Sequence, residues 1–519
     1  MSAGLDATVA GLTASWSAGD APGGVVALFD AGGIRSSWCL GLADLASRRP
    51  WSLDTPTRLA SISKHICASA AQRLGLAGRI GDTLGELARP VADTTVASAL
   101  TMTSGVPDLA ETLTLSGVSW MGGIDAERLF ALACRLDHLN FAAGSEVSYS
   151  NTNTRLVQRM IERRTGMPLR RWLDENLFAP LGLSSFALVE DQTECVPGLA
   201  TGYWFADGAP RFGWYGLHYS GSGGIVASAQ DLASWLRALA AGSGPLAGLL
   251  AELGEVGVLA DGTRTAYARG LTQTPIGDRV FLGHGGSLPG YKDHCLVDPR
   301  SGLGIVVLSN REDTEAETMA ATVMAAHLGA TIDWRRPAAM TTGLFVDPAN
   351  GHTLELADAA RGPTAAFLGA EEKLYLAEDG TWTSRSAHLP IRIAPTALGA
   401  DEIQASIGNR PPIGFRRARA ATSDDLAGSY RCAALDARHE IALRSEGPAI
   451  RFGGGPAPAA WESMTPTAPD CFTTQTPPLG PWRLRPALKF DRDAAGRVRG
   501  FMLSSNRSRG WRFERDRGG

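Results

Sequence analysis

The sequence predicts a multidomain protein in which one large α+β domain precedes two small antiparallel β domains. Three observations support this fold class. Strand-like segments stand at both ends of the first 335 residues, and helical patterns dominate between them. The rest of the chain consists of short alternating runs between Gly, Pro and Asp turns. This second part also repeats itself at a constant offset of 85 residues.

The predicted elements of the first part follow one another in a clear order. Residues 4–17 show a weakly amphipathic helical pattern, and the apolar run 25–29 turns back into a second strand over 34–40. Helical patterns and returning strands follow, the helices at 126–136, 154–166, 230–241 and 315–328, the strands at 280–283, 295–298 and 304–309. We therefore expect a sheet that is assembled from distant parts of the chain.

The repeat divides the second part into two similar units, which we place at 338–420 and 421–519. Turn residues and apolar residues recur together, in the pairs Gly343/Gly428, Phe345/Tyr430, Leu356/Ile441, Gly362-Pro363/Gly447-Pro448 and Phe367/Phe452. Small antiparallel domains tend to close into barrels or sandwiches, because closure removes unpaired strand edges.

Composition excludes several classes of function. The 519 residues carry a net charge of −4 without a basic run, so a nucleic-acid partner is not expected. No segment is apolar and long enough to cross a membrane, and the N-terminus does not look like a secretory signal. The seven scattered cysteines indicate free thiols in a reducing, cytoplasmic compartment. His and Cys residues show no metal-ligand spacing, so we expect no metal and no cofactor.

A serine and a lysine stand three residues apart at the predicted start of a helix. Ser61 and Lys64 share one face of such a helix, so the two side chains can touch. Lys64 is one of four lysines among 49 basic residues, and lysine, unlike arginine, can lose its proton when it is buried. A serine needs such a base to become a nucleophile. The alternative is a capping serine beside a surface lysine, since four-residue matches often arise by chance.

A second group of polar residues, 148–151, lies between a turn and a predicted helix. Tyr149 can hold its phenol over a neighbouring serine from this position. A nearby ammonium would lower the phenol pKa from about 10, so that a phenolate could act as a base. Asn151 carries a carboxamide that both donates and accepts hydrogen bonds, which suits a substrate amide. A core tyrosine with a satisfied hydroxyl is the alternative.

A third motif, His284-Gly285-Gly286-Ser287, follows a strand-like segment. The two glycines remove side chains where a substrate would lie against a strand edge. His284 is then expected at the rim of this edge. A histidine in an ordinary turn is the alternative.

Taken together, these motifs resemble the serine β-lactamase-like, penicillin-recognising hydrolases, and in particular their D-aminopeptidase branch. The matching segments follow the family's order between residues 20 and 330, at 61–64, 100–108, 149–151, 180–183, 223–225, 231–233 and 284–286. The resemblance implies a β-lactamase-like (penicillin-binding) α+β catalytic domain over 1–335. Two antiparallel β-barrel domains would follow it, over 338–420 and 421–519. By the same analogy the protein would form a homodimer.

The resemblance also implies roles for the matching residues. Ser61 would be the acylated nucleophile at a helix N-terminus, whose dipole favours developing negative charge. Lys64 and Tyr149 would form the proton-shuttling pair, with either of them as the general base. The backbone N–H groups of Ser61 and Ser287 would form the oxyanion hole, typically worth about 3 kcal/mol per donor.

The resemblance extends to substrate recognition. His284 stands where relatives carry lysine or histidine, and Asn151 would orient the substrate amide. In the D-aminopeptidase branch a loop of the last barrel returns to the active site, limits substrate size and meets the free amino group. The matching loop is 471–481, and Gln475 stands where the family's amine-binding aspartate is expected, so the charge-assisted part of that contact is lost. Asp470 is the alternative partner, and a rigid connection without this role is the other interpretation.

The sequence therefore predicts a metal-free serine aminopeptidase that releases small N-terminal D-amino acids through an acyl-enzyme. Its substrates would be peptides, amides or esters with a free N-terminus, and β-lactams would be candidate inhibitors. The enzymatic alternative is an esterase, a D-alanyl-D-alanine carboxypeptidase or a β-lactamase of the same fold. The non-enzymatic alternative is a sensor that β-lactams acylate once without turnover.

Overall fold

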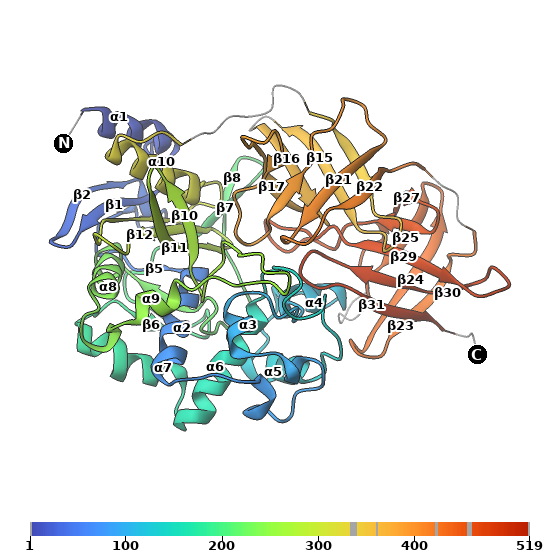
Figure 1. The fold of residues 1–519 in the computed structure, drawn as a ribbon, viewed down its shortest axis with the longest axis horizontal. Helices are drawn as coiled ribbons and strands as arrows, with labels where there is room; N and C mark the ends of the chain where they lie inside the picture. Colours follow the sequence, from blue (N-terminus) through green and yellow to red (C-terminus); the bar gives the residue numbers. More distant parts are fainter. Residues whose placement is uncertain (1–2, 333–339, 360–361, 421–423, 454–458, 517–519) are drawn as a thin grey trace.

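A computed structural model describes residues 3–332, 340–359, 362–420, 424–453 and 459–516 of the chain (Figure 1). Its first part is a sheet flanked by helices. Two all-β bodies follow along the chain and lie to one side of this first part (Figure 1).

A six-stranded antiparallel sheet forms the centre of the first part, in the order β10-β11-β12-β13-β1-β2. Its strands are β1 (Gly24–Asp30), β2 (Gly33–Leu40), β10 (Thr272–Ile276), β11 (Arg279–Leu288), β12 (Tyr291–Val297) and β13 (Gly304–Ser309). Strand β1 pairs with β13, so that Gly24 stands opposite Ser309 and Phe29 opposite Gly304. The prediction of a sheet assembled from distant parts of the chain is thus confirmed.

Helices cover both faces of this sheet, which explains why β1 is apolar at almost every position. Val26 packs with helix α1 (Ala3–Leu12) and helix α10 (Ala316–Leu328) on one face. Val25 points to the opposite face and belongs to the larger core cluster, to which helix α8 (Ala229–Ala241) contributes. Successive side chains of a strand alternate between faces. Each fully buried side chain of this kind contributes about 1.5–3 kcal/mol to stability.

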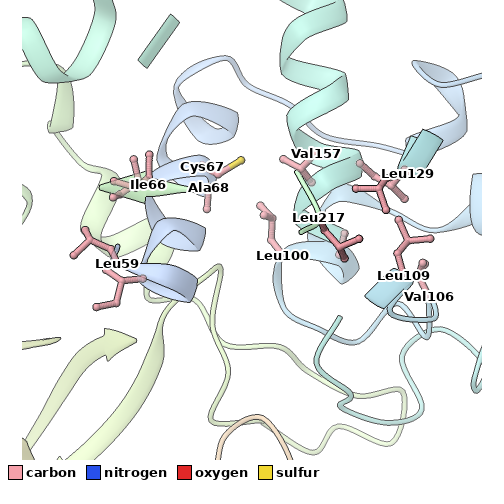
Figure 2. Close-up of a cluster of buried hydrophobic side chains, with 14 of the residues drawn as sticks. Leu59, Ile66, Cys67, Ala68, Leu100, Val106, Leu109, Leu129, Val157 and Leu217 are labelled. Atoms are coloured by element: carbon pink, nitrogen blue, oxygen red, sulfur yellow. The ribbon is translucent and has the colours of Figure 1, made fainter. Parts of the chain in front are cut away.

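The remaining helices of the first part lie beside one buried helix, α2 (Ser63–Arg73). They are α3 (Val96–Leu100), α4 (Leu109–Leu115), α5 (Ala126–Cys134), α6 (Asn151–Thr165), α7 (Leu169–Leu173) and α9 (Leu249–Leu253). Helices α6 and α9 lie against α2, and α3, α4 and α7 lie behind α6. Figure 2 shows Ile66, Cys67 and Ala68 of α2 in a cluster that also holds Val157 of α6. Residues 63–71 of α2 are all buried, so the helix cannot shift without disturbing this core.

Short strands link these helices, and one of them, β5 (Thr57–Arg58), leads into the turn before α2. The others are β3 (Leu42–Asp44), β4 (Arg49–Pro50), β6 (Ala187–Leu188), β7 (Tyr203–Ala206), β8 (Ala209–Phe212) and β9 (Ile225–Ala227). Strand β9 lies between β5 and β6 in a small three-stranded sheet. This sheet holds the chain in place just before α2 begins.

Two nine-stranded antiparallel sheets, nearly closed and barrel-like, make up the rest of the chain. The first comprises β14 (Gly343–Val346), β15 (Thr353–Ala359), β16 (Gly362–Phe367), β17 (Ala370–Lys373), β18 (Tyr375–Leu376), β19 (Trp382–Thr383), β20 (Ile391–Ile393), β21 (Glu402–Ile407) and β22 (Ile413–Arg417). The second comprises β23 (Gly428–Cys432), β24 (Ala437–Arg444), β25 (Gly447–Arg451), β26 (Glu462–Ser463), β27 (Thr465–Ala468), β28 (Cys471–Thr473), β29 (Ala487–Arg492), β30 (Val498–Ser504) and β31 (Trp511–Arg515). The predicted fold class is confirmed.

The sequence repeat reappears in the strand register of these two sheets. The matched pairs are Gly343 with Leu356 and Gly428 with Ile441, then Leu356 with Ala365 and Ile441 with Ile450. Both sheets also arrange their strands in the same order, which runs 4-3-2-1-9-8-7-6-5 along each set of nine. The two sheets are therefore copies of one architecture.

The predicted domain boundaries at 335–338 and 420–421 fall on or beside residues 333–339 and 421–423, which lie outside the described residues. The division into 1–335, 338–420 and 421–519 remains a prediction. Among the described residues, no helix has the length and apolar character that a membrane span requires.

Candidate active site

Ser61 stands at a strained turn that leads into α2. The short helix Ala60–Ile62 connects β5 with α2, and Ala60 has a φ of 46°, in the left-handed region that non-glycine residues rarely adopt. The Leu59 N–H donates to the Ile225 carbonyl at 2.9 Å and holds the preceding residue. Strain of this kind costs about 1–3 kcal/mol and persists only where the surroundings fix it. Ser61 remains partly accessible, while its chain neighbours are buried.

Lys64 lies one helical turn further along and is buried, with its ammonium nitrogen among three oxygens. Nζ lies 3.0 Å from the Ser61 Oγ, 2.8 Å from the Asn151 Oδ1 and 2.7 Å from the Ser222 carbonyl oxygen. Burial lowers the pKa of Lys64 well below its usual value of 10.5. The predicted contact between Ser61 and Lys64 is therefore present, and the lysine is held in a setting that favours its uncharged form.

Tyr149 reaches the same serine from the turn before α6. Its hydroxyl donates a hydrogen bond to the Ser61 Oγ at 2.6 Å, and Lys64 Nζ lies 4.6 Å from the centre of its ring. Burial raises the pKa of Tyr149 above its usual value of 10, which outweighs the lowering by the hydrogen bond to Ser61 and by the Arg507 charge. This differs from the lowered phenol pKa that an adjacent ammonium alone would give. Tyr149 is a proton donor in this arrangement.

Asn151 orients the lysine and is itself oriented by Asp108. The Asn151 side-chain N–H and backbone N–H donate to the Asp108 Oδ2 at 3.0 and 2.7 Å. The other Asp108 oxygen accepts from two backbone N–H groups at the start of α4, as an N-cap does. These contacts turn the Asn151 oxygen toward Lys64 and leave no choice of amide orientation.

His284 lies deeper than the rim position that the sequence suggested. Its side chain is fully buried on β11, with Nε2 2.9 Å from the Tyr267 hydroxyl and Nδ1 2.5 Å from the Gly285 carbonyl oxygen. Burial lowers the pKa of His284 well below 6.5, so the ring is neutral. Since a carbonyl only accepts, Nδ1 carries the proton and Nε2 accepts from Tyr267. Among the described residues, His284 makes no hydrogen bond to Ser61.

Ser287 lies further along β11 and is exposed at the cavity. Its Oγ accepts a hydrogen bond from the Lys292 Nζ at 2.7 Å. Lys292 also pairs with Glu312 at 2.9 Å, and Glu312 accepts from the Trp482 indole N–H at 3.0 Å. A side chain of the last sheet is therefore joined to the strand that carries the His-Gly-Gly motif.

The predicted loop 471–481 borders the cavity, but Gln475 does not. Gln475 is half-buried and is absent from the residues that line the cavity in the described part of the chain. The segment reaches the cavity through Leu479 and is followed there by Trp482 and Arg483. The assignment of amine recognition to Gln475 stays a prediction.

Two site residues come from the β sheets and carry no recognisable local signal in the sequence. His388 follows β19, and its ring lies 4.8 Å from the Tyr149 ring and 5.1 Å from the His284 ring. Arg507 follows β30, and its guanidinium lies 4.8 Å from the centre of the Tyr149 ring. Each nine-stranded sheet thus contributes one side chain beside Tyr149.

These residues share one cavity of about 1210 Å³. Its lining includes Ser61, Tyr149, Asn151, His284, Ser287, His388 and Arg507. Four aromatic side chains form one wall of this cavity. The ring centres lie 5.1 Å apart between Tyr215 and Tyr219, 5.0 Å between Tyr215 and Trp120, and 5.6 Å between Trp120 and Trp482. Such a cavity can hold a small substrate with an apolar part beside the serine. In the described residues, no group of His, Cys, Asp and Glu is arranged to hold a metal ion.

Comparison with known protein families agrees with this geometry. A family model described as "Beta-lactamase" matches residues 5–329, which is more than half of the chain. The chain belongs to the beta-lactamase family. The match covers the six-stranded sheet, α2 and β11, and so contains every catalytic-site residue predicted within the first domain.

Relatives resemble the chain over nearly its whole length. A D-aminopeptidase from Brucella anthropi is 28% identical over 508 residues, which cover 93% of each chain. Among solved structures, the octameric penicillin-binding protein homologue from Pyrococcus abyssi gives a TM-score of 0.56 at 17% identity and covers 79% of this chain and 99% of that one. D-amino acid amidase from Ochrobactrum anthropi SV3, complexed with L-phenylalanine amide, gives a TM-score of 0.51 at 23% identity. This match covers 63% of this chain and 99% of the amidase. At these identities the two structures support the fold.

Proposed function

We propose that this protein is a serine aminopeptidase that releases small N-terminal D-amino acids from peptides, amides or esters. One observation carries the proposal. The Ser61 Oγ lies within hydrogen-bond reach of a buried lysine amine and of a tyrosine hydroxyl, and Ser61 lines a large cavity. The D-aminopeptidase relatives, which are similar along most of the chain, support the substrate class.

Lys64 is the general base in this proposal, because the N–H groups and the lone pair of its uncharged amine match the three oxygens around it. An uncharged amine has two N–H groups, which donate to the Asn151 and Ser222 oxygens, and one lone pair, which accepts the Ser61 proton. Ser61 then attacks the substrate carbonyl and forms a C–O bond. The proton returns from Lys64 by way of Tyr149 to the leaving amine as the C–N bond breaks. Water repeats the sequence on the acyl-enzyme and releases the amino acid.

The oxyanion is assigned to the backbone N–H groups of Ser61 and Ser287, as in related hydrolases. Gly286 supports this assignment, because a Cβ at that position would lie 2.4 Å from the Leu59 carbonyl oxygen. Strand β11 therefore approaches the Ser61 turn more closely than any side chain at Gly286 would allow. His284, neutral and fixed by Tyr267, shapes the same edge without carrying charge.

Substrate size is limited in this proposal by the 471–481 segment, with Leu479 as the residue at the cavity. Gln475 is proposed to meet the substrate amine, on the strength of its aligned position alone. Replacement of Gln475 by Asp tests the assignment, because a carboxylate at this position would restore a charge-assisted contact and lower KM for substrates with a free amine. An unchanged KM removes Gln475 from the site.

The experiment compares hydrolysis of D-alanine p-nitroanilide with that of its N-acetylated form and its L-isomer. The proposal expects efficient release of p-nitroaniline from the free D-amine alone, and no release by Ser61→Ala. If the N-acetylated compound were hydrolysed as fast as the free D-amine, the protein would be an amidase or esterase and not an aminopeptidase. A single burst without turnover would indicate the sensor instead.

We also propose that the protein is a homodimer that acts in the cytoplasm and that β-lactams inhibit it. Resemblance to the family supports these three points. Light scattering of the purified chain measures the oligomer directly, and one solved structural neighbour is itself octameric. Loss of D-alanine p-nitroanilide hydrolysis after incubation with a penicillin tests the inhibition.

A further inference from the structure

The turn between β30 and β31 of the last sheet is built into the wall of the catalytic cavity. Main-chain and side-chain groups of residues 505–509, here called the 505–509 turn, bond to the first domain at many points. The Arg507 carbonyl accepts from the Asp108 N–H and from the Asn140 side chain, both at 2.9 Å. The Arg507 N–H donates to the Glu111 Oε2 at 2.7 Å. These contacts fix the turn without using the Arg507 side chain.

A buried ion pair anchors the end of this turn. The Arg509 guanidinium donates to the Glu146 carboxylate at 2.8 Å, and the side chains are only 4% and 1% exposed. Arg410 of the first β sheet approaches the same carboxylate at 3.6 Å. Glu146 lies three residues before Tyr149, so both β sheets are joined to the segment that carries the site tyrosine.

The Arg507 side chain itself points to Tyr149. Its guanidinium carbon and the Lys64 Nζ lie 4.8 and 4.6 Å from the centre of the same ring. Its nearest carboxylate oxygen among the described ion pairs is the Glu111 Oε1, at a loose 3.9 Å. Arg507 is 34% exposed and lines the cavity, so its charge faces the reacting groups.

From this placement we propose that Arg507 is a positioning residue of the active site, whose fixed positive charge adds to the effect of burial in favouring the uncharged, proton-accepting form of Lys64. The proposal rests on the roles assigned above to Ser61 and Lys64. Two cations on one aromatic ring repel each other across a low-dielectric site, and arginine cannot give up its proton. The lysine is therefore the one that loses its charge.

Among the charged and titratable groups around Lys64, Asp108 acts against Arg507. The groups that face Lys64 or Tyr149 are Cys67 of α2, Asp108 and Glu111 at α4, Tyr215, Tyr267, His284 of β11, His388 and Arg507. After burial, the Asp108 carboxylate raises the pKa of Lys64, and Arg507 lowers it again. The histidines are neutral, since burial lowers the pKa of His388 to about 3. The Arg507 charge thus offsets part of the rise in the Lys64 pKa that Asp108 causes.

The proposal fixes the direction of a pH shift. The rate of Ser61 acylation rises with pH as Lys64 loses its proton. The rising part of the pH–rate profile, here called the acid limb, therefore follows the pKa of Lys64. Without the Arg507 charge the pKa of Lys64 rises, so the acid limb moves to higher pH. A unit charge at this range through a partly buried site shifts the limb by about one pH unit. Below the limb, the acylation rate then falls about tenfold at any given pH.

The experiment measures the rate at which a fluorophosphonate probe labels Ser61 between pH 5 and 9. This probe has no carboxylate and no amine, so it reports the reactivity of the serine and not the binding of a charged substrate. The full-length variants are Arg507→Gln, Arg507→Lys and Arg512→Gln. Arg512 lies on β31 of the same sheet and pairs with the exposed carboxylates of Asp491 and Glu514, so its loss controls for a general change in charge.

Arg507→Gln is expected to shift the acid limb up by about one unit, Arg507→Lys to keep it near the wild-type position, and Arg512→Gln to leave it unchanged. Thermal unfolding of each variant verifies the fold. An unshifted limb in a folded Arg507→Gln protein overturns the proposal. So does a change confined to KM for D-alanine p-nitroanilide, because it would mean that Arg507 binds substrate. Failure of the proposed function gives a different result, namely wild-type labelling of Ser61 without hydrolysis of the anilide.

Discussion

The Glu146–Arg509 pair predicts a large loss of stability when one partner is removed. Arg509→Met leaves the Glu146 carboxylate buried, with Arg410, whose guanidinium is 3.6 Å away, as its remaining ion-pair partner among the described residues. Breaking a buried ion pair from one side costs about 3–5 kcal/mol. The remaining cation offsets part of this cost, which places the loss near the lower end, at about 3 kcal/mol. For a large cooperative unit, this corresponds to a fall in Tm of about 5 °C or more.

Differential scanning calorimetry of Arg509→Met against Arg512→Met measures this loss. Arg512 forms an ion pair of the same 2.8 Å length with Asp491, but both partners are exposed, so its replacement should cost less than about 1 kcal/mol. The double variant Glu146→Gln/Arg509→Met should recover part of the stability, because the negative charge of the Glu146 carboxylate is then no longer buried. Equal melting temperatures for Arg509→Met and Arg512→Met would refute the reasoning.

Two further predictions test the strand edge and the last sheet. Gly286→Ala should slow fluorophosphonate labelling of Ser61 by about tenfold or more, because the added Cβ would lie 2.4 Å from the Leu59 carbonyl oxygen. Gly285→Ala should have a smaller effect, because the nearest atom to its Cβ would be 3.2 Å away. Equal labelling rates for the two variants would contradict this prediction. Burial lowers the pKa of His439 to about 4, below the unfolded value of about 6.5, so its contribution to stability is present at pH 7 and is lost as the pH falls. Urea unfolding at pH 7 and pH 5 should show about 2 kcal/mol less pH dependence in His439→Gln than in the wild type; an equal dependence would refute the assignment.

Features that depend on residue spacing and on hydrophobic patterns could be predicted from the sequence. The contact of Ser61 with Lys64 follows from helical spacing, and the register of the two β sheets follows from shared turns at 362–363 and 447–448. The assembly of the central sheet from residues 24–30 and 304–309 follows from apolar runs at both ends of one domain. In these cases the residues that make the prediction also make the contact.

The rest depends on contacts between segments that are far apart in the sequence. His388 and Arg507 lie in turns of the β sheets, and no spacing or motif connects them with Tyr149, more than 200 residues earlier. The raised pKa of Tyr149 cannot be predicted from the sequence either, because its burial outweighs the Ser61 hydrogen bond and the Arg507 charge, and burial is a property of the assembled core. The same holds for Glu146, a polar residue in a turn whose partners come from both β sheets.

Trapping of the acyl-enzyme tests the central claim most directly. A D-alanine ester is mixed with the protein, quenched in acid within the first turnovers, and digested for peptide mass spectrometry. The account predicts one D-alanyl group on Ser61 in the wild type, none in Ser61→Ala, and almost none in Lys64→Arg, because arginine retains its proton. Hydrolysis of the ester by Ser61→Ala, or a D-alanyl group on another residue, would contradict it.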